Sequence, residues 1–445
     1  MEKLEKLEKG SSKLLNAWAF YDWANSVYTL TIASAVFPIF YDALFSERNH
    51  YIEVFGLSLK NSALISFVTA TAFLIVAFCS PILSGVADYI GNKKSFMKFF
   101  CYLGSLACMG LYWFDLDNIY IGLLFYLLGL IGYWGSLVFY NSYLPDIAYP
   151  EQQDKISAKG FSFGYIGSVL LLIINLGMIM KPTFFGITGT ESQAAMKAMR
   201  YSFVMVGIWW ILFSQYTYFY LPNGNTNSNQ KVSKHIIFNG FKELRKVWVL
   251  LKQNVPLKRY LGSFFVSSMA VQTVMLVATY FGAQEITWSS KTEGTIGLII
   301  CILLIQFLAI AGSQITAKLS TKFGNIKTLI FINSFWVLLC GGAYFIDLPF
   351  QFYAMAALVG LVMGGVQSLS RSTYSKLLPE TQDTTSFFSF YDVAEKVGIV
   401  IGMCVYGTID QITGSPRLAI VFLALFFVLA VILLIRIPKT KVLNS

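Results

Sequence analysis

The chain has 445 residues, of which 56% are hydrophobic, 16% aromatic and only 13% charged. A soluble globular protein carries about 25% charged residues, so this composition excludes an ordinary soluble protein and indicates one that lies in lipid. The net charge of +10 would suit a nucleic-acid-binding protein, but the positions of the basic residues, described below, exclude that class.

Long apolar stretches recur along the whole chain, and a helix needs about 20 such residues to cross a bilayer core. The stretches are unbroken rather than alternating, which favours helices over the strands of a closed barrel. We therefore predict an all-α integral membrane protein with twelve transmembrane helices. The predicted spans are 15–44, 61–87, 95–114, 118–144, 158–180, 199–221, 258–285, 293–317, 327–346, 350–378, 386–409 and 417–436.

The basic residues gather on one side of these spans. With the N-terminus inside, 24 of the 33 Lys and Arg residues lie in or beside the inner segments and seven in the outer ones. This asymmetry predicts that both termini are cytoplasmic and accounts for the net charge without a nucleic acid. All six cysteines fall inside spans without the spacing of a metal site, so we expect neither a metal nor a cofactor.

Polar and aromatic side chains interrupt the first span. Asp22 and Asn25 are about one turn apart, and Tyr21 and Tyr28 are seven residues apart on one face. One interpretation is that these four residues line a substrate cavity. The other is that Asp22, two turns from the inner end, belongs to a cytoplasmic gate or caps a neighbouring helix.

A glycine-containing loop follows the second span, S-G-V-A-D-Y-I-G-N-K-K at 84–94. Gly85 and Gly91 would permit close helix approach and a tight turn, and Asp88 can accept hydrogen bonds from a helix N-terminus in the opposite half. We expect Lys93 and Lys94 to anchor the turn at the inner surface.

The segment 222–256 divides the chain almost evenly. It begins with the polar run N-G-N-T-N-S-N-Q and continues as an amphipathic helix, in which Phe241, Leu244, Trp248 and Leu251 follow steps of three and four among basic residues. This helix either lies in the inner headgroup layer or packs on the cytoplasmic helix ends. The predicted domains are 1–221, 222–256 and 257–445.

The two halves resemble each other in sequence. Y-I-G-N-K-K-S at 89–95 recurs as K-F-G-N-I-K-T at 322–328, and P-E-Q-Q-D at 150–154 recurs as P-E-T-Q-D at 379–383. Both pairs keep the same predicted sidedness, so we expect two six-helix parallel repeats related by an axis along the membrane normal, with the substrate site between them.

The loop at 84–94 resembles the signature of the major facilitator superfamily between its second and third helices. Y-D-W-A-N-S-V-Y at 21–28, G-G-V-Q-S-L-S-R-S-T-Y-S-K-L-L-P at 364–379 and F-F-S-F-Y-D-V-A-E-K at 387–396 look like its vacuole-effluxer-like branch. That branch includes bacterial members and the fungal autophagy-related vacuolar amino-acid effluxer. The resemblance implies the major facilitator fold and a transporter, with amino acids as the substrate class of the fungal relative.

Charged side chains inside the later spans are costly unless they are paired or hydrated, so each is a functional candidate. Arg371 shares a face with Gln367 and Tyr374 and could meet an anionic substrate group. Further substrate-binding candidates are Trp134, Asn141 and Gln272.

The span 386–409 carries Asp392, Glu395 and Lys396 within little more than one turn. One interpretation pairs Asp392 with Arg371 in a salt bridge between adjacent helices, and another makes Asp392 or Glu395 a protonation site. As a gate or proton-coupling set we take these three residues together with Asp22.

The combined prediction is a secondary active transporter, not an enzyme, that moves a small polar solute by alternating access with proton coupling. An amino acid or another zwitterion fits a cavity that carries both signs of charge. The alternatives are a transporter of sugars, peptides or amphipathic compounds, or a nontransporting receptor or scaffold. Its expected partners are a small-molecule substrate, membrane lipid and protons, and we expect a monomer in the bacterial inner membrane.

Overall fold

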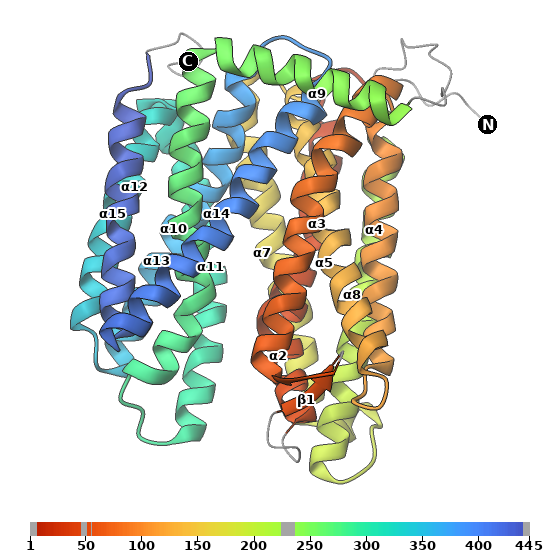
Figure 1. Ribbon diagram of the computed structural model, residues 1–445, viewed down its shortest axis with the longest axis vertical. Helices are drawn as coiled ribbons and strands as arrows, with labels where there is room; N and C mark the ends of the chain where they lie inside the picture. The colour runs from red at the N-terminus through yellow and green to blue at the C-terminus, as the bar shows by residue number, and fades with distance from the viewer. Residues whose placement is uncertain (1–6, 46–50, 55, 224–235, 439–445) are drawn as a thin grey trace.

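The computed structural model describes residues 7–45, 51–54, 56–223 and 236–438. Most helices run along the long axis of the molecule and form two bundles that stand side by side (Figure 1). The first residues of α1 and the last residues of α15 lie at the same end of the molecule, which we call the terminal end.

The first bundle holds the elements up to Tyr220. They are α1 (Ser12–Val27), the π-helix η1 (Tyr28–Ala35), α2 (Val36–Leu44), α3 (Asn61–Ile90), α4 (Lys93–Gly110), η2 (Leu111–Trp113), α5 (Ile119–Ser142), α6 (Leu144–Ile147), α7 (Pro150–Met180), η3 (Pro182–Phe185) and α8 (Glu191–Tyr220). An antiparallel hairpin of β1 (Tyr51–Val54) and β2 (Leu57–Lys60) joins α2 to α3, a feature that the sequence analysis did not predict.

The second bundle follows a helix that crosses the terminal end, α9 (Ile236–Gln253). Its elements are α10 (Val255–Glu285), α11 (Lys291–Phe323), α12 (Asn325–Gly342), η4 (Ala343–Phe345), α13 (Pro349–Leu377), α14 (Thr384–Thr413) and α15 (Pro416–Ile435). Most of the polar run before α9 lies outside the described residues.

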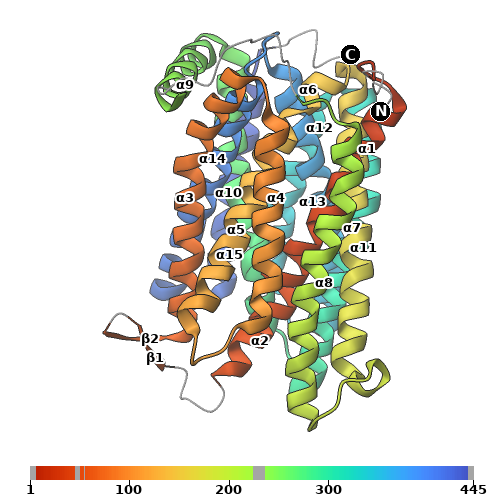
Figure 2. The ribbon, with the colours of Figure 1, turned by 90° about the vertical axis from the view of Figure 1, so that its right-hand side faces the viewer.

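Ten helical segments of the described chain are long and apolar enough to cross a membrane. They do not include α4, which is 18 residues long and carries three lysines, or α14, which carries Asp392, Glu395 and Lys396. Both helices nevertheless run alongside the others (Figures 1 and 2). Twelve crossings therefore stay a prediction for α4 and α14, because charged groups lower the apolar character of both helices.

The first predicted span is not one regular helix. Its middle, η1, has π-helical hydrogen bonding from Tyr28 to Ala35. At its start the Thr29 hydroxyl donates a 2.8 Å hydrogen bond to the Ser26 carbonyl, a local bond that competes with the helix ladder. Single π-helical turns occur often at functional sites, and η1 contributes to the cavity described below.

Each bundle has its own hydrophobic core. One cluster of buried side chains runs from Leu14 to Leu221, and a second runs from Val247 to Ile437 with Tyr165 of α7 added. The largest buried side chains include Trp18 and Trp210 in the first cluster and Trp336 in the second. Two separate cores leave polar groups free to line the seam between the bundles.

The repeated glycine motifs both end a helix at a glycine with positive φ, although the ψ angles differ, 28° at Gly91 and 155° at Gly324. Gly91 ends α3 with φ of +72° and Gly324 ends α11 with φ of +84°. Residues other than glycine rarely adopt such positive φ values. The chain then starts α4 or α12 at once, so each motif joins two neighbouring antiparallel helices.

Glycine also permits the close contact between α4 and α5. A Cβ atom added at Gly132 would lie 2.3 Å from the Cα and 2.4 Å from the backbone nitrogen of Gly104. Because the opposing atoms belong to the backbone, the two helices would have to separate.

We predict that Gly132→Ala lowers stability by about 1–3 kcal/mol, the usual cost of overpacking, and reduces the apparent melting temperature of the purified protein. Gly177→Ala is the control, because nothing lies within 4 Å of a Cβ added there. Equal melting temperatures for the two variants would contradict the close helix contact.

Candidate functional site: a cavity between the bundles

A polar cavity of about 1530 Å³, including the part open to solvent, lies between the two bundles. The first bundle contributes residues of α1, η1, α5 and α7, and the second contributes residues of α10, α11, α13 and α14. Its lining combines hydroxyl and amide groups with aromatic rings and three charged side chains, Asp22, Arg371 and Glu395.

An ion pair between the bundles forms the cavity floor on the terminal side. Both terminal nitrogens of Arg371 on α13 lie 3.2 Å from Oδ2 of Asp22 on α1. Tyr140 donates a 2.8 Å hydrogen bond to the same oxygen. Arg371 and Asp22 are 3% and 5% exposed, so the pair is shielded from water and strongly coupled.

All five N–H donors of Arg371 have acceptors. Besides Asp22, the guanidinium donates to the hydroxyl and the carbonyl oxygen of Ser157, each at 3.0 Å, and to Oδ1 of Asn141 at 3.3 Å. Phe161 and Trp18 hold the cation between their rings at 4.2 and 4.7 Å. In this conformation Arg371 has no donor left for a substrate.

The alternative that pairs Arg371 with Asp392 is wrong in this conformation. Asp392 instead binds Lys396 on its own helix at 2.9 Å and accepts a 3.4 Å hydrogen bond from Ser80 of α3. Proximity along a helical hairpin suggested the Asp392 pair, whereas the actual partner of Arg371 is 349 residues away in the other bundle.

A second set of charged side chains along the seam lies on α14. Lys396 binds both Asp392 and Glu395 at 2.9 Å, and Gln272 of α10 donates a 2.9 Å hydrogen bond to Glu395. The Lys396 ammonium also lies 3.6 Å from the ring centre of Trp134 on α5. Of the three charged side chains only Glu395, whose side chain is 20% exposed, lines the cavity.

The charges along the seam do not balance. Arg371 and Lys396 face three carboxylates, those of Asp22, Asp392 and Glu395. An unmatched negative charge is expensive in a low-dielectric site, so it favours binding of one proton or one cationic group.

A further buried network joins the bundles beyond the cavity floor. Asp154 of α7 binds Lys376 at 2.8 Å and accepts hydrogen bonds from Ser320 at 2.8 Å and Asn325 at 2.9 Å. Lys376 also donates to Asn325 at 3.1 Å. All four side chains are less than 9% exposed.

The loop at 84–94 makes the third connection between the bundles. Asp88 accepts hydrogen bonds from the backbone nitrogens of Thr385 and Ser386 at 3.3 and 2.6 Å, so the expected bond to a helix N-terminus of the other bundle is present. The partial positive charge of the α14 N-terminus favours this carboxylate.

The two lysines of this motif both bind protein groups at the terminal end, and their anchoring role at the inner membrane surface stays a prediction. Lys93 is buried, pairs with Asp146 and donates a 3.0 Å hydrogen bond to Thr384 of α14. Lys94 donates to the carbonyl of Leu221 at 2.7 Å.

Helix α9 lies against the outside of this closed end. A Cβ atom at Gly85 would lie 2.3 Å from the Gly240 carbonyl oxygen, so Gly85 provides room for α9. Lys246 of α9 binds Asp383, which precedes α14, at 2.9 Å. The hydrogen bond to Asp383 raises the pKa of the Lys246 ammonium, which therefore stays charged at neutral pH.

The predicted site residues fall into two groups. The cavity lining includes Asp22, Trp134, Asn141, Gln272, Gln367, Arg371 and Glu395. The predicted residues outside that lining are Tyr21, Asn25, Tyr28, Tyr374, Asp392 and Lys396. For the first three the reason is helix geometry, because they share a face of the first span that packs into its own bundle, while Asp22 lies about 100° away.

Tyr374, the remaining predicted substrate contact, faces the core of its own bundle. It is fully buried and donates a 2.6 Å hydrogen bond to the Phe387 carbonyl. Gln367 does reach the cavity, where its amide oxygen accepts a 2.9 Å hydrogen bond from Tyr165 of the other bundle.

Sequence reasoning missed Tyr140, Ser157, Asp154 and Lys376 as connections between the bundles. The sequence did single out Asp154, because it is the last residue of P-E-Q-Q-D, one copy of a repeated motif. In the sequence analysis that motif serves only as evidence of a repeat and lies between two predicted spans. In the structure, residues 150–154 form the first turns of α7. Tyr140 and Ser157 carried no distinguishing pattern.

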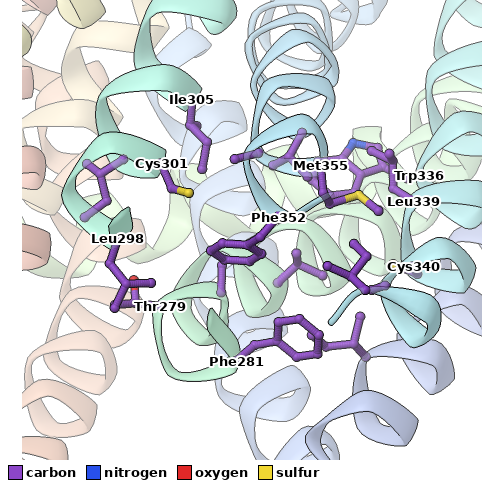
Figure 3. Close-up of a pocket in the computed structure, with 18 residues that line it drawn as sticks. Thr279, Phe281, Leu298, Cys301, Ile305, Trp336, Leu339, Cys340, Phe352 and Met355 are labelled. Atoms are coloured by element: carbon purple, nitrogen blue, oxygen red, sulfur yellow. The ribbon is translucent and has the colours of Figure 1, made fainter. Parts of the chain in front are cut away.

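A second pocket, shown in Figure 3, is confined to the second bundle. Its volume is about 700 Å³, including the part open to solvent, and its walls come from α10, α11, α12, η4, α13 and α15. Phe352, Met355 and Cys301 are among its apolar walls, with Thr279 as a rare polar group. Because every wall belongs to one bundle, rocking of the bundles would not expose this pocket to alternate sides.

Solved structures share this arrangement of helices. The transporter FucP of the major facilitator superfamily, solved in the outward conformation, superposes with a TM-score of 0.70 at 14% identity, covering 96% of this chain and 99% of that one. The proton:xylose symporter XylE gives 0.65 at 15% identity, covering 97% of each chain. The chain therefore has the major facilitator fold.

Sequence relatives cover almost the whole chain. It is 31% identical over 433 residues to the "Uncharacterized MFS-type transporter YxiO" of Bacillus subtilis, covering 97% of this chain and 96% of the relative. Autophagy-related protein 22-2 of Aspergillus oryzae is 23% identical over 483 residues, covering 88% of this chain and 76% of the relative. The family described as "Vacuole effluxer Atg22 like" matches residues 10–444, so the chain belongs to this family of major facilitator transporters.

Proposed function

We propose that this secondary transporter moves a small polar zwitterion, with amino acids as the leading class, by alternating access and in exchange with or together with a proton. The observation that carries the proposal is the Arg371–Asp22 pair, which closes one end of a polar cavity with one residue from each bundle. Rocking of the bundles would break this pair and open the cavity toward the terminal end.

The proposal includes the topology of the predicted domains 1–221, 222–256 and 257–445. α4 and α14 would be the two crossings beyond the ten apolar ones, and the concentration of basic residues would keep the terminal end cytoplasmic. The conformation described here would then face outward. We place the protein in the bacterial cell membrane as a monomer.

Substrate recognition would use a carboxylate and a guanidinium group of the protein, one after the other. Glu395 lines the cavity and can accept a hydrogen bond from the ammonium group of a zwitterion. The substrate carboxylate would have to replace Asp22 as the partner of Arg371, since the guanidinium donors are all occupied. Substrate binding would thereby weaken the bond that holds the terminal end closed.

Proton coupling would use the unmatched carboxylate of α14. Asp392 and Glu395 share one lysine, so protonation of either removes the excess negative charge. Ser80 of α3 contacts Asp392, which connects the protonation state of α14 to the other bundle.

We predict that Asp392→Asn or Glu395→Gln abolishes uphill uptake driven by a pH gradient but leaves exchange of internal for external substrate. A neutral amide in place of either carboxylate leaves two carboxylates for the two cations of the seam. The amide cannot bind and release a proton during the transport cycle. Radiolabelled amino acids in proteoliposomes provide the measurement. Asp410→Asn, on the same helix but outside the cavity lining, is the control. Undiminished uphill uptake by both Asp392→Asn and Glu395→Gln would contradict carboxylate coupling.

We also predict that Asp22→Asn destabilises the closed terminal end by about 3–5 kcal/mol, because it leaves the buried Arg371 charge without its partner. The measurement is the apparent melting temperature, and the charge swap Asp22→Arg with Arg371→Asp should recover part of the loss. Asp115→Asn is the control, since its 3.2 Å pair with Arg200 is half-exposed and should contribute about 1 kcal/mol or less. Equal effects of Asp22→Asn and Asp115→Asn would argue against a stabilising pair.

A sugar is the second candidate substrate. Gln272, Gln306, Gln367 and Asn141 place four amide groups in the cavity beside aromatic rings, a set that suits hydroxyl recognition. A thermal-shift screen of the purified protein against amino acids and sugars distinguishes the candidates, because a ligand that binds the folded state raises the melting temperature.

A further inference from the structure

Helix α9 lies across the terminal end, roughly at right angles to the bundle helices (Figure 1), and extends along the edge of the molecule beside α3 (Figure 2). One of its faces is buried, with Val247 unexposed and Leu251 3% exposed. Gly240 fits so tightly on α3 that an added Cβ would lie 2.8 Å from Val86. Protein contacts therefore hold α9 on this face.

The same helix contacts both bundles. Gly240 packs on α3 of the first bundle, while Lys246 binds Asp383 beside α14 of the second. Trp248 adds a ring contact with Phe390 of α14 at 5.4 Å between ring centres. A ligand that holds α9 in place therefore acts on the seam between the bundles.

A second face of α9 is exposed over most of its length in the described part of the chain, apart from the contact of Trp248 with Phe390. Phe241, Arg245, Trp248 and Lys252 follow steps of four, three and four, so they form one strip along the helix, which we call the α9 strip. Phe241 and Trp248 are 47% and 43% exposed, and both basic residues are exposed. The Lys252 ammonium lies 4.9 Å from the ring centre of Trp248.

We propose that the α9 strip binds the surface of an anionic phospholipid bilayer. Its two aromatic rings suit the boundary between headgroups and acyl chains, and its two cations suit anionic headgroups. The contact of Trp248 with Phe390, the seventh residue of α14, places this part of the strip beside a bundle helix. The neighbouring α3 continues this apolar surface with Leu74 and Phe78, 63% and 72% exposed.

The charge pattern favours lipid over a soluble acidic protein. Arg245 and Lys252 lie beside the exposed rings of Phe241 and Trp248, an arrangement that suits a headgroup surface, whereas the exposed Lys242 and Lys246 lie outside the strip. Because α9 contacts both bundles, bound lipid would hold the terminal end in its closed arrangement. The lipid site itself does not depend on the identity of the substrate.

The test is hydrogen exchange of α9 in the full-length protein, measured in nanodiscs of phosphatidylcholine alone and of phosphatidylcholine with phosphatidylglycerol. We expect the amides of 240–253 to exchange roughly 25-fold more slowly in the anionic discs, since each of the two basic residues near such a surface contributes about a fivefold effect. Arg245→Gln with Lys252→Gln should remove the difference.

Lys242→Gln with Lys322→Gln is the matched control, because it removes the same charge from exposed positions outside the α9 strip. Persistence of the lipid effect in this control supports the proposal. Equal exchange in the two kinds of disc overturns it, as does equal loss of the effect in both double variants. If the α9 amides exchange more slowly only when polyglutamate is added, the strip binds an acidic protein and the lipid proposal is overturned.

Discussion

A charged group buried in a membrane protein must find a partner, and the partner of Arg371 comes from the opposite bundle. Arg371 and Asp22 are nearly inaccessible to water, so neither is stable without the other while both stay charged. Because the two residues belong to different bundles, their need for each other holds the two bundles together. The bundles can separate at this point only if something else neutralises or solvates the two charges, and a substrate that carries both signs of charge meets that condition.

The remaining contacts of the terminal end follow the same rule with different chemistry. Asp154 collects an ammonium, an amide and a hydroxyl from the second bundle, and Asp88 uses the backbone nitrogens at the start of α14. In all three sets the carboxylate belongs to the first bundle and accepts hydrogen bonds from donors of the second, to which Tyr140 of the first bundle adds one at Asp22. Since each set is buried or half-buried and well satisfied, the closed end is held by several bonds that must break together, which favours two discrete states over gradual opening.

Part of this structure was predictable from sequence because lipid imposes strict conditions. Unbroken apolar runs had to be helices, and Gly91 and Gly324 had to mark turns between them. Asp88 was recognisable as a helix-terminus ligand from its position in the loop motif. The partner of Arg371 was not predictable, because a single sequence does not say which distant helices face each other, and adjacency along the chain favoured Asp392. The grouping of Tyr21 and Tyr28 with Asp22 failed because side chains one residue apart on a helix point about 100° apart.

The central claim is that the two bundles move as bodies about the cavity, and distances between spin labels test it most directly. In a background lacking the six cysteines, one label pair would replace Lys155 and Lys322 at the terminal end, and another would replace Phe184 and Phe350 at the opposite end. The account predicts that Asp22→Asn lengthens the first distance and shortens the second in the same population of molecules. A change at one end alone, or at neither, would contradict it.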